Sequence, residues 1–209
     1  MSAANVHPKL LAELIDNAVE FSTYKGPSDF NDTIYLRPED GALTAYGFHL
    51  YALLRESREV EGMEPGDGLM VDRYEVADFA KALRKVDGFG RKDTAVQVEL
   101  GSRFTVTHGD QTLVDLGESP SAENLGSTAE HVGLYELADE WLGREDREVR
   151  GVRLTKDMAQ KLTKIKTGKP PSDVEVWEMR AVGDKGAMRV RIGQADVYFM
   201  SARGIIEMD

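Results

Sequence analysis

Lysines near the C-terminus form the part of the sequence best suited to binding an anion. On a helical wheel Lys156, Lys161 and Lys164 occupy one arc, and Met158 and Leu162 occupy the opposite arc. If the apolar arc packs on a sheet, the ammonium groups point away from it. Lysine is a mobile point charge, so it can follow a phosphate backbone without reading bases. This arc predicts binding of a polyanion without sequence preference, and the alternative is an ordinary solvated helix face.

A second basic face is expected on an earlier helix. Lys81, Arg84 and Lys85 lie opposite the apolar Phe79 and Leu83 on that wheel. Cations in a last helical turn also complement the helix dipole, so the last two have a structural explanation as well. The first expected helix differs, because its carboxylates would repel a polyanion unless that helix lies at an interface.

The charge of the chain is unevenly distributed. The 209 residues contain 26 Lys and Arg against 37 Asp and Glu, a net charge of −11. Residues 1–149 hold 14 basic and 29 acidic groups, net −15, whereas residues 150–209 hold 12 and 8, net +4. This asymmetry is typical of a protein that is kept soluble by acidic groups while one part meets an anionic partner. Uneven charge without a function is the alternative.

Catalytic and metal-binding patterns are weak in this sequence. There is no cysteine, which excludes disulfides, thiolate metal sites and cysteine nucleophiles and favours a reducing cytoplasm. Ser22 to Lys25 matches S-x-x-K and Lys166 to Gly168 matches K-T-G, but Ser22 is expected to end a helix and Gly168 to stop one, which is the wrong context for a nucleophile. The four histidines lack metal-binding spacing. We therefore expect no enzyme activity, no cofactor and no metal.

The targeting signals are equally sparse. The start of the chain lacks a basic stretch followed by an apolar one, and no run approaches the roughly 18 apolar residues of a membrane span. We expect a cytoplasmic protein with no membrane partner.

Hydrophobic periodicity predicts three blocks of similar design. Helices are expected at Pro8–Ser22, Tyr74–Val86 and, from an N-cap at Thr155, to Lys166. Short leading strands are expected at Gly68–Val71 and Gly151–Leu154, but none before the first helix. After the first helix, strands are expected around Ile34–Leu36 and Leu43–Tyr46, and Phe48–Leu54 is either a strand or a short helix. The remaining expected strands are Val96–Leu100, Phe104–Thr107, Leu113–Leu116, Val174–Met179, Ala187–Ile192 and Ala195–Met200.

These blocks predict an α+β fold made of repeated strand-helix-three-strand units, in which antiparallel sheets carry helices on one face. Residues 1–118 would form one domain of two units, residues 119–149 a linker or degenerate segment with one helix at Leu134–Leu142, and residues 150–209 a third, basic unit.

This order of elements, with basic stripes on helices of an acidic chain, resembles the DNA sliding clamps, the ring-shaped processivity factors of replicative polymerases. The similarity rests on residues 69–116 and 152–200, with a looser match over residues 8–54. The resemblance implies sheets on the outside of a ring and helices facing duplex DNA. Rings in this family have twelve units, so a chain of four units would close as a trimer and a chain of three as a tetramer.

Taken together, the basic faces and the resemblance predict a clamp-like, sequence-independent DNA-binding factor. Its partners would be double-stranded DNA, further copies of itself, and a DNA polymerase or other DNA enzyme that it tethers. One alternative is a sequence-specific regulator whose helix-turn-helix comprises Leu134–Leu142 and Thr155–Lys166. The other is a protein-interaction module of clamp architecture without a DNA role. The predicted DNA-binding residues are Lys81, Arg84, Lys85, Lys156, Lys161, Lys164 and Lys166.

Overall fold

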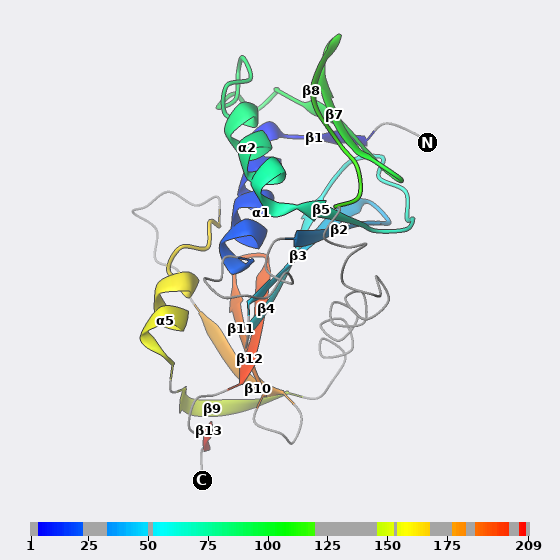
Figure 1. Ribbon diagram of the computed structural model, residues 1–209. Helices are drawn as coiled ribbons and strands as arrows, with labels where there is room; N and C mark the ends of the chain where they lie inside the picture. The colour runs from blue at the N-terminus through cyan, green and yellow to red at the C-terminus, as the bar shows by residue number, and fades with distance from the viewer. Residues whose placement is uncertain are drawn as a thin grey trace.

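The computed structural model describes residues 4–22, 33–49, 52–119, 146–152, 154–167, 177–182, 187–200 and 205–207. Within these ranges the strands form two antiparallel sheets, and the three helices lie together on one side of them (Figure 1). The predicted α+β class is therefore confirmed. The elements are β1 (Ala4–Val6), α1 (Pro8–Phe21), β2 (Thr33–Glu39), β3 (Ala42–His49), β4 (Ala52–Glu59), β5 (Leu69–Asp72), α2 (Arg73–Leu83), β6 (Val96–Leu100), β7 (Phe104–His108), β8 (Gln111–Leu116), β9 (Asp146–Val152), α5 (Lys156–Leu162), β10 (Glu178–Val182), β11 (Ala187–Ile192), β12 (Ala195–Met200) and β13 (Ile205–Glu207).

Three units share the order strand, helix and three strands, although the sequence predicts the leading strand for only two of them. The first comprises β1, α1 and β2 to β4, the second β5, α2 and β6 to β8, and the third β9, α5 and β10 to β12. The first two units exchange their leading strands: β1 pairs with β6, and β5 pairs with β2. Each leading strand thus completes the sheet of the other unit, which joins the two units.

The third unit is attached through its last strand. β12 pairs antiparallel with β4, in the register Val197 to Leu54, so one sheet of nine strands runs in the order β13-β9-β10-β11-β12-β4-β3-β2-β5. The other sheet has the order β1-β6-β7-β8. The nine-stranded sheet therefore contains strands from both of the predicted domains, whose boundaries remain a prediction.

The buried residues of α1 explain why this helix packs on one face of the nine-stranded sheet. On α1, Leu11, Leu14, Ile15 and Ala18 are fully buried, and the helix packs against β3 and β4. The approach to β3 is very close, because a Cβ on Gly47 would stand 2.3 Å from the carbonyl oxygen of Ala18. Only glycine permits this contact, which fixes the height of α1 above the sheet.

Two leading strands differ from the expectation. β1 was not predicted, since three residues are too few to show an alternating pattern, yet Ala4 and Val6 are buried against the core. β9 begins at Asp146, inside the segment predicted as a linker, and it pairs with β10. The strand was expected at Gly151–Leu154, so its end is predicted approximately and its start is not. The charged residues 146–150 concealed that start because backbone hydrogen bonds, rather than hydrophobic alternation, define it.

Several predicted boundaries are wrong by a few residues. Phe48–Leu54 is not one element, because β3 ends at His49 and β4 begins at Ala52. The strand expected at Val174–Met179 is β10, which continues to Val182 because Ala181 and Val182 are buried and paired with β11. Residues 174–176 and the expected helix Leu134–Leu142 lie outside the described residues.

Both later helices are shorter than predicted. α2 ends at Leu83 and α5 ends at Leu162, and each continues into tighter turns with i to i−3 hydrogen bonds. After α5 the backbone of Lys166 bonds to a side chain of α1, which competes with the next helical turn. Among the aromatic residues of the third unit, Tyr198 and Phe199 are buried, and Trp177 packs on the core while half-buried.

Candidate nucleic-acid interface

Helix α2 and the two residues after it present three of the predicted cations to solvent. The Asp72 carboxylate caps its first turn by accepting hydrogen bonds from the backbone N–H of Tyr74 at 2.8 Å and of Glu75 at 3.1 Å. Four apolar or small residues of its inner face are buried, so Lys81, Arg84 and Lys85 remain exposed. The Lys81 ammonium forms an ion pair with Asp78 on the same helix at 2.7 Å.

Helix α5 presents a second, smaller group. The Thr155 hydroxyl caps it by accepting a hydrogen bond from the Met158 N–H at 3.2 Å. Met158 and Leu162 are buried as the helical wheel predicts, and Lys156 and Gln160 are exposed. The basic arc therefore points away from the sheet at these two positions.

Lys161 departs from that arc. Its side chain is only 6% exposed, and its ammonium group donates a hydrogen bond to the backbone carbonyl of Glu20 at 2.9 Å. It also lies 6.0 Å from the centre of the Phe21 ring. Burial lowers its pKa below the usual value. Lys161 thus docks α5 onto the end of α1, which a wheel cannot reveal because it ignores neighbouring elements.

The acidic face of α1 lies between the two basic helices. Asp16 forms ion pairs with Arg84, which follows α2, and with Lys166, which follows α5. Glu20 pairs with Lys164 at 2.7 Å. The carboxylates of α1, which the sequence predicts to repel a polyanion, therefore pair with cations that follow α2 and α5. Helix α1 lies at the contact between these two helices.

A buried polar cluster holds the segment after α5 against α1. The Asn17 side chain accepts a hydrogen bond from the Lys166 N–H at 2.8 Å and donates to the Lys166 carbonyl at 2.8 Å. The same amide donates to Glu56 on β4 at 2.8 Å, and Arg58 donates to that carboxylate at 2.7 Å. These contacts fix where Lys164 and Lys166 lie, and no local sequence pattern predicts them.

Glu56 gives this cluster a pH dependence. Burial raises the pKa of Glu56 to about 7, against the opposing effects of Arg58 and Asn17, and the nearby Glu13 also raises it. Because the folded-state pKa lies above the unfolded value of 4.5, the folded chain retains this proton longer than the unfolded chain. The stability contribution is complete below pH 4.5 and is lost as the pH rises through 7.

We therefore predict that Glu56→Gln removes part of the pH dependence of folding. Between about pH 4.5 and 7, the free energy of unfolding of the unsubstituted chain should fall relative to the variant by up to about 3 kcal/mol. Urea unfolding of both proteins across this range measures the difference. Parallel pH profiles would show that Glu56 does not titrate in this window.

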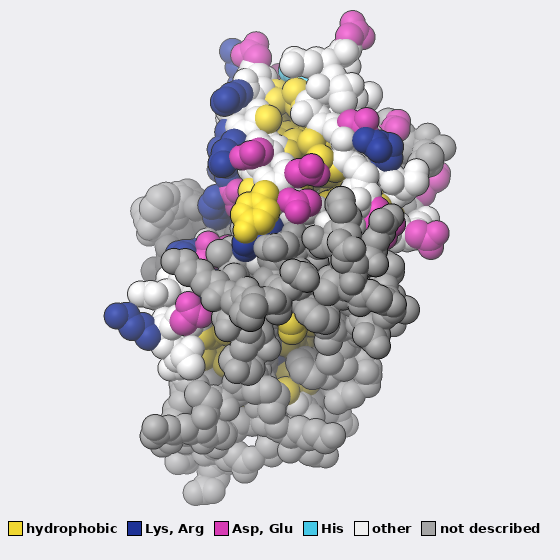
Figure 2. Space-filling view, viewed as in Figure 1, with side chains coloured by type: hydrophobic (Ala, Val, Ile, Leu, Met, Phe, Trp, Pro, Cys, Tyr) yellow, Lys and Arg dark blue, Asp and Glu magenta, His cyan; other side chains and the backbone are white. Residues whose placement is uncertain are grey.

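The exposed cations gather along one edge of the molecule. Figure 2 shows Lys and Arg side chains along the margin formed by α2 and α5, with carboxylates between them. Exposed fractions of the side chains are 69% for Lys81, 59% for Lys164, 47% for Lys166 and 37% for Arg84. We call the six exposed cations on this edge the helix-layer cations: Lys81, Arg84, Lys85, Lys156, Lys164 and Lys166. Six of the seven predicted DNA-binding residues thus lie along this edge, whereas Lys161 is buried.

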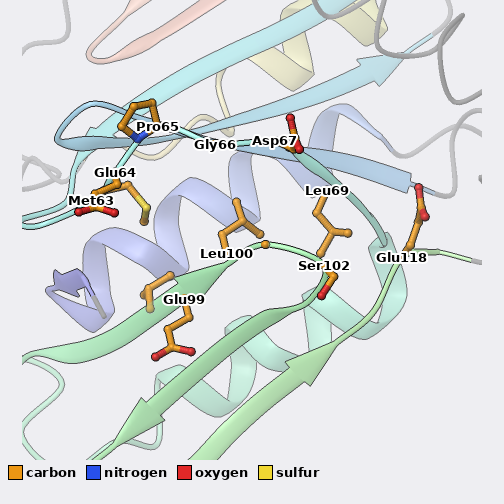
Figure 3. Close-up of a pocket in the computed structure, with 13 residues that line it drawn as sticks. Met63, Glu64, Pro65, Gly66, Asp67, Leu69, Glu99, Leu100, Ser102 and Glu118 are labelled. Atoms are coloured by element: carbon orange, nitrogen blue, oxygen red, sulfur yellow. The ribbon is translucent and has the colours of Figure 1, made fainter. Parts of the chain in front are cut away.

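A pocket of about 560 Å³ is lined by none of the helix-layer cations (Figure 3). One wall is the loop from Met63 to Leu69, and the other is the end of β6 with the turn after it. Its lining contains four carboxylates and no basic residue: Glu64, Asp67, Glu99 and Glu118. These carboxylates repel phosphate, so this pocket is not a candidate site for DNA.

The structure assigns local packing roles to the residues behind the catalytic motifs. Ser22 is buried at the end of α1, where its hydroxyl donates to the Ala18 carbonyl at 3.0 Å. Lys166 pairs with Asp16, and Gly168 is outside the described residues. Within the described ranges, no group of three or more His, Asp or Glu side chains is placed to hold a metal ion. No described helix is long and apolar enough to cross a membrane.

The helix-turn-helix alternative has little structural support. It expects helix or turn after Pro171, whereas the described residues there form the antiparallel strands β10 to β12. Its first helix, Leu134–Leu142, falls on residues that the structure does not describe.

Comparison with solved structures identifies the fold as that of the bacterial sliding clamps. The β subunit of DNA polymerase III from Bartonella birtlesii matches with a TM-score of 0.61 at 10% identity, over 98% of this chain and 66% of that one. The corresponding clamps of Pseudomonas aeruginosa (0.58, 13%, 97% and 65%) and Thermotoga maritima (0.59, 10%, 99% and 65%) match similarly. This chain thus spans just under two thirds of the length of these clamps. No family model and no curated protein matches its sequence.

Proposed function

We propose that this protein is a cytoplasmic, non-enzymatic, clamp-like factor that holds duplex DNA against its helix layer without reading sequence. It would tether a DNA polymerase or another DNA enzyme to that duplex. The observation that carries the proposal is the row of exposed cations on the helix side of a clamp fold. The acidic remainder of the chain limits contact with DNA to this side.

The chemistry of the helix-layer cations suits transient contact. Most of them are lysines on flexible stems, which favour phosphate groups through charge without a bidentate geometry. Binding of this kind is weak, depends strongly on salt and permits sliding along the duplex. A tether that must move with an enzyme needs these properties.

Neutralising three cations tests this proposal. Lys81, Lys85 and Lys156 are exposed, and none of them holds α1 and α5 together, so their replacement by glutamine should leave the fold intact. We expect weaker binding to duplexes of unrelated sequence. The slope of log affinity against log salt should shrink by about 0.9 for each phosphate that the variant no longer neutralises, or by up to about 3 for the triple variant.

The matched control replaces three arginines of the sheets, Arg37, Arg103 and Arg180, by glutamine. The two triple variants have the same net charge, so a long-range charge effect would weaken both equally. An unchanged salt slope in the lysine variant, with binding retained, would place the DNA elsewhere. No duplex binding by the unsubstituted protein at low salt would favour the protein-interaction alternative.

We further propose that the protein acts as a homo-oligomer, a trimer or a tetramer if it closes a ring. Support comes from the way its own units join. The last strands of the first and third units, β4 and β12, pair edge to edge, whereas β8, the last strand of the second, ends its sheet among the described strands. Because no described strand pairs with the outer edge of β8, we propose that a strand of another copy pairs there.

A further inference from the structure

Asp16 occupies a position between two helix-layer cations. Its carboxylate contacts both the Arg84 guanidinium and the Lys166 ammonium, which belong to different units of the chain. Partial burial, followed by the charge of Arg84, lowers the pKa of Lys166. Two cations held this close repel one another, and the carboxylate between them compensates that repulsion.

Glu20, one turn further along α1, also lies beside two cations. Its carboxylate pairs with Lys164 at 2.7 Å and lies 4.0 Å from the ammonium group of Lys161. The shorter contact of Lys161, at 2.9 Å, is made to the backbone carbonyl of Glu20. The hydrogen bond that docks α5 onto α1 therefore does not use the Glu20 carboxylate. That carboxylate instead competes with other anions for Lys164.

The two carboxylates thus meet cations that a DNA phosphate would otherwise contact. Arg84, Lys164 and Lys166 are 37% to 59% exposed, so a phosphate can approach them, but it must compete with Asp16 or Glu20. A carboxylate and a phosphate oxygen both accept charge-assisted hydrogen bonds from these side chains. The competition lowers the number of counterions that DNA binding releases.

We propose that Asp16 and Glu20 act as built-in competitors of the DNA backbone, which hold Arg84, Lys164 and Lys166 in intramolecular ion pairs and keep the affinity for duplex low. This inference rests on the proposed function and adds to it what determines the affinity of the helix-layer cations for DNA. A tether that slides along DNA needs a low affinity for the duplex, and these two carboxylates lower that affinity.

The test replaces both carboxylates by their amides, Asp16→Asn and Glu20→Gln, in the full chain. Both amides preserve side-chain size, and the contacts from Asn17 to Lys166 and from Lys161 to the Glu20 carbonyl remain. Binding to a duplex of arbitrary sequence is measured by fluorescence anisotropy over a range of salt concentrations. Circular dichroism and urea unfolding establish that the variant is folded.

The expected result is tighter binding with a steeper salt dependence. Freeing two or three cations should steepen the slope of log affinity against log salt by about 2. With equal affinities near about 1 M salt, this corresponds to about a hundredfold tighter binding at about 0.1 M. The matched control is Glu59→Gln with Glu99→Gln, two exposed carboxylates on the sheets. It changes the net charge equally and should change the salt slope by much less.

The outcomes separate this inference from the proposed function. If the unsubstituted protein binds DNA and the α1 variant binds with the same slope, or with the slope of the control, the competition is refuted while the proposed function stands. If neither the protein nor the α1 variant binds duplex at low salt, the proposed function itself fails. If the α1 variant misfolds, Glu20→Gln alone tests Lys164, with an expected steepening of about 1.

Discussion

Replacing Asn17 by alanine should lower the free energy of unfolding by about 3–5 kcal/mol. The Asn17 amide bonds to the N–H and the carbonyl of Lys166 and to the Glu56 carboxylate, and it is 1% exposed. Alanine would leave a buried carboxylate and two backbone groups with fewer partners. The cost exceeds that of one ordinary hydrogen bond because these groups would give up their bonds without regaining water.

Urea unfolding measures this change, with Asn5→Ala as the matched control. Asn5 is exposed on β1 and pairs through its backbone, so its replacement should cost well under 1 kcal/mol. The Asn17 variant should also loosen the attachment of the segment after α5, which hydrogen exchange at Lys166 would reveal. A decrease below about 1 kcal/mol would mean that the cluster is not a significant link between the first and third units.

Interrupting the edge of β8 should convert an assembly into single chains. Along a regularly paired strand, successive N–H groups point to opposite sides, so Val114 and Asp115, which pair with Val106 and Thr105, direct one N–H toward β7 and one outward. Proline removes the N–H at its own position. Of the variants Val114→Pro and Asp115→Pro, one should lose mainly stability and the other mainly self-association.

Light scattering at micromolar concentration measures the mass of each variant. The unsubstituted chain should have three or four times the mass of its 23.2 kDa chain, and the proline variant that retains stability should approach 23.2 kDa. Urea unfolding shows which variant no longer has the hydrogen bond to β7. If the variant that remains stable also keeps the full mass, β8 is not the interface, and a single-chain mass for the unsubstituted protein would refute the oligomer.

Much of the fold follows from periodicity in the sequence. The alternation in 104–107 and 187–192 and the apolar stripe of α1 indicate which face is buried, because each pattern is long enough to match one period. β1 and the first five residues of β9 escaped prediction because pairing with distant strands, rather than their own composition, defines them. The ends of α2 and α5 likewise depend on tertiary contacts.

The candidate site is predictable in outline. A helical wheel places Lys81 and Lys156 correctly, since exposure of these side chains depends only on their own helix. It fails for Lys161, which reaches the carbonyl of Glu20, and it cannot pair Asp16 with Arg84 across 68 residues. Such contacts depend on how three helices lie side by side, which only the folded chain reveals.

The most direct test asks which face of the protein touches DNA. Because the chain has no cysteine, a single introduced cysteine can carry a photo-crosslinker at a chosen position. Gln160→Cys places it on the exposed face of α5, and Gln97→Cys places it on the exposed face of β6 as a matched control. The account predicts crosslinks to duplex DNA from position 160 and few from position 97. Crosslinks mainly from position 97, or equally from both, would contradict it.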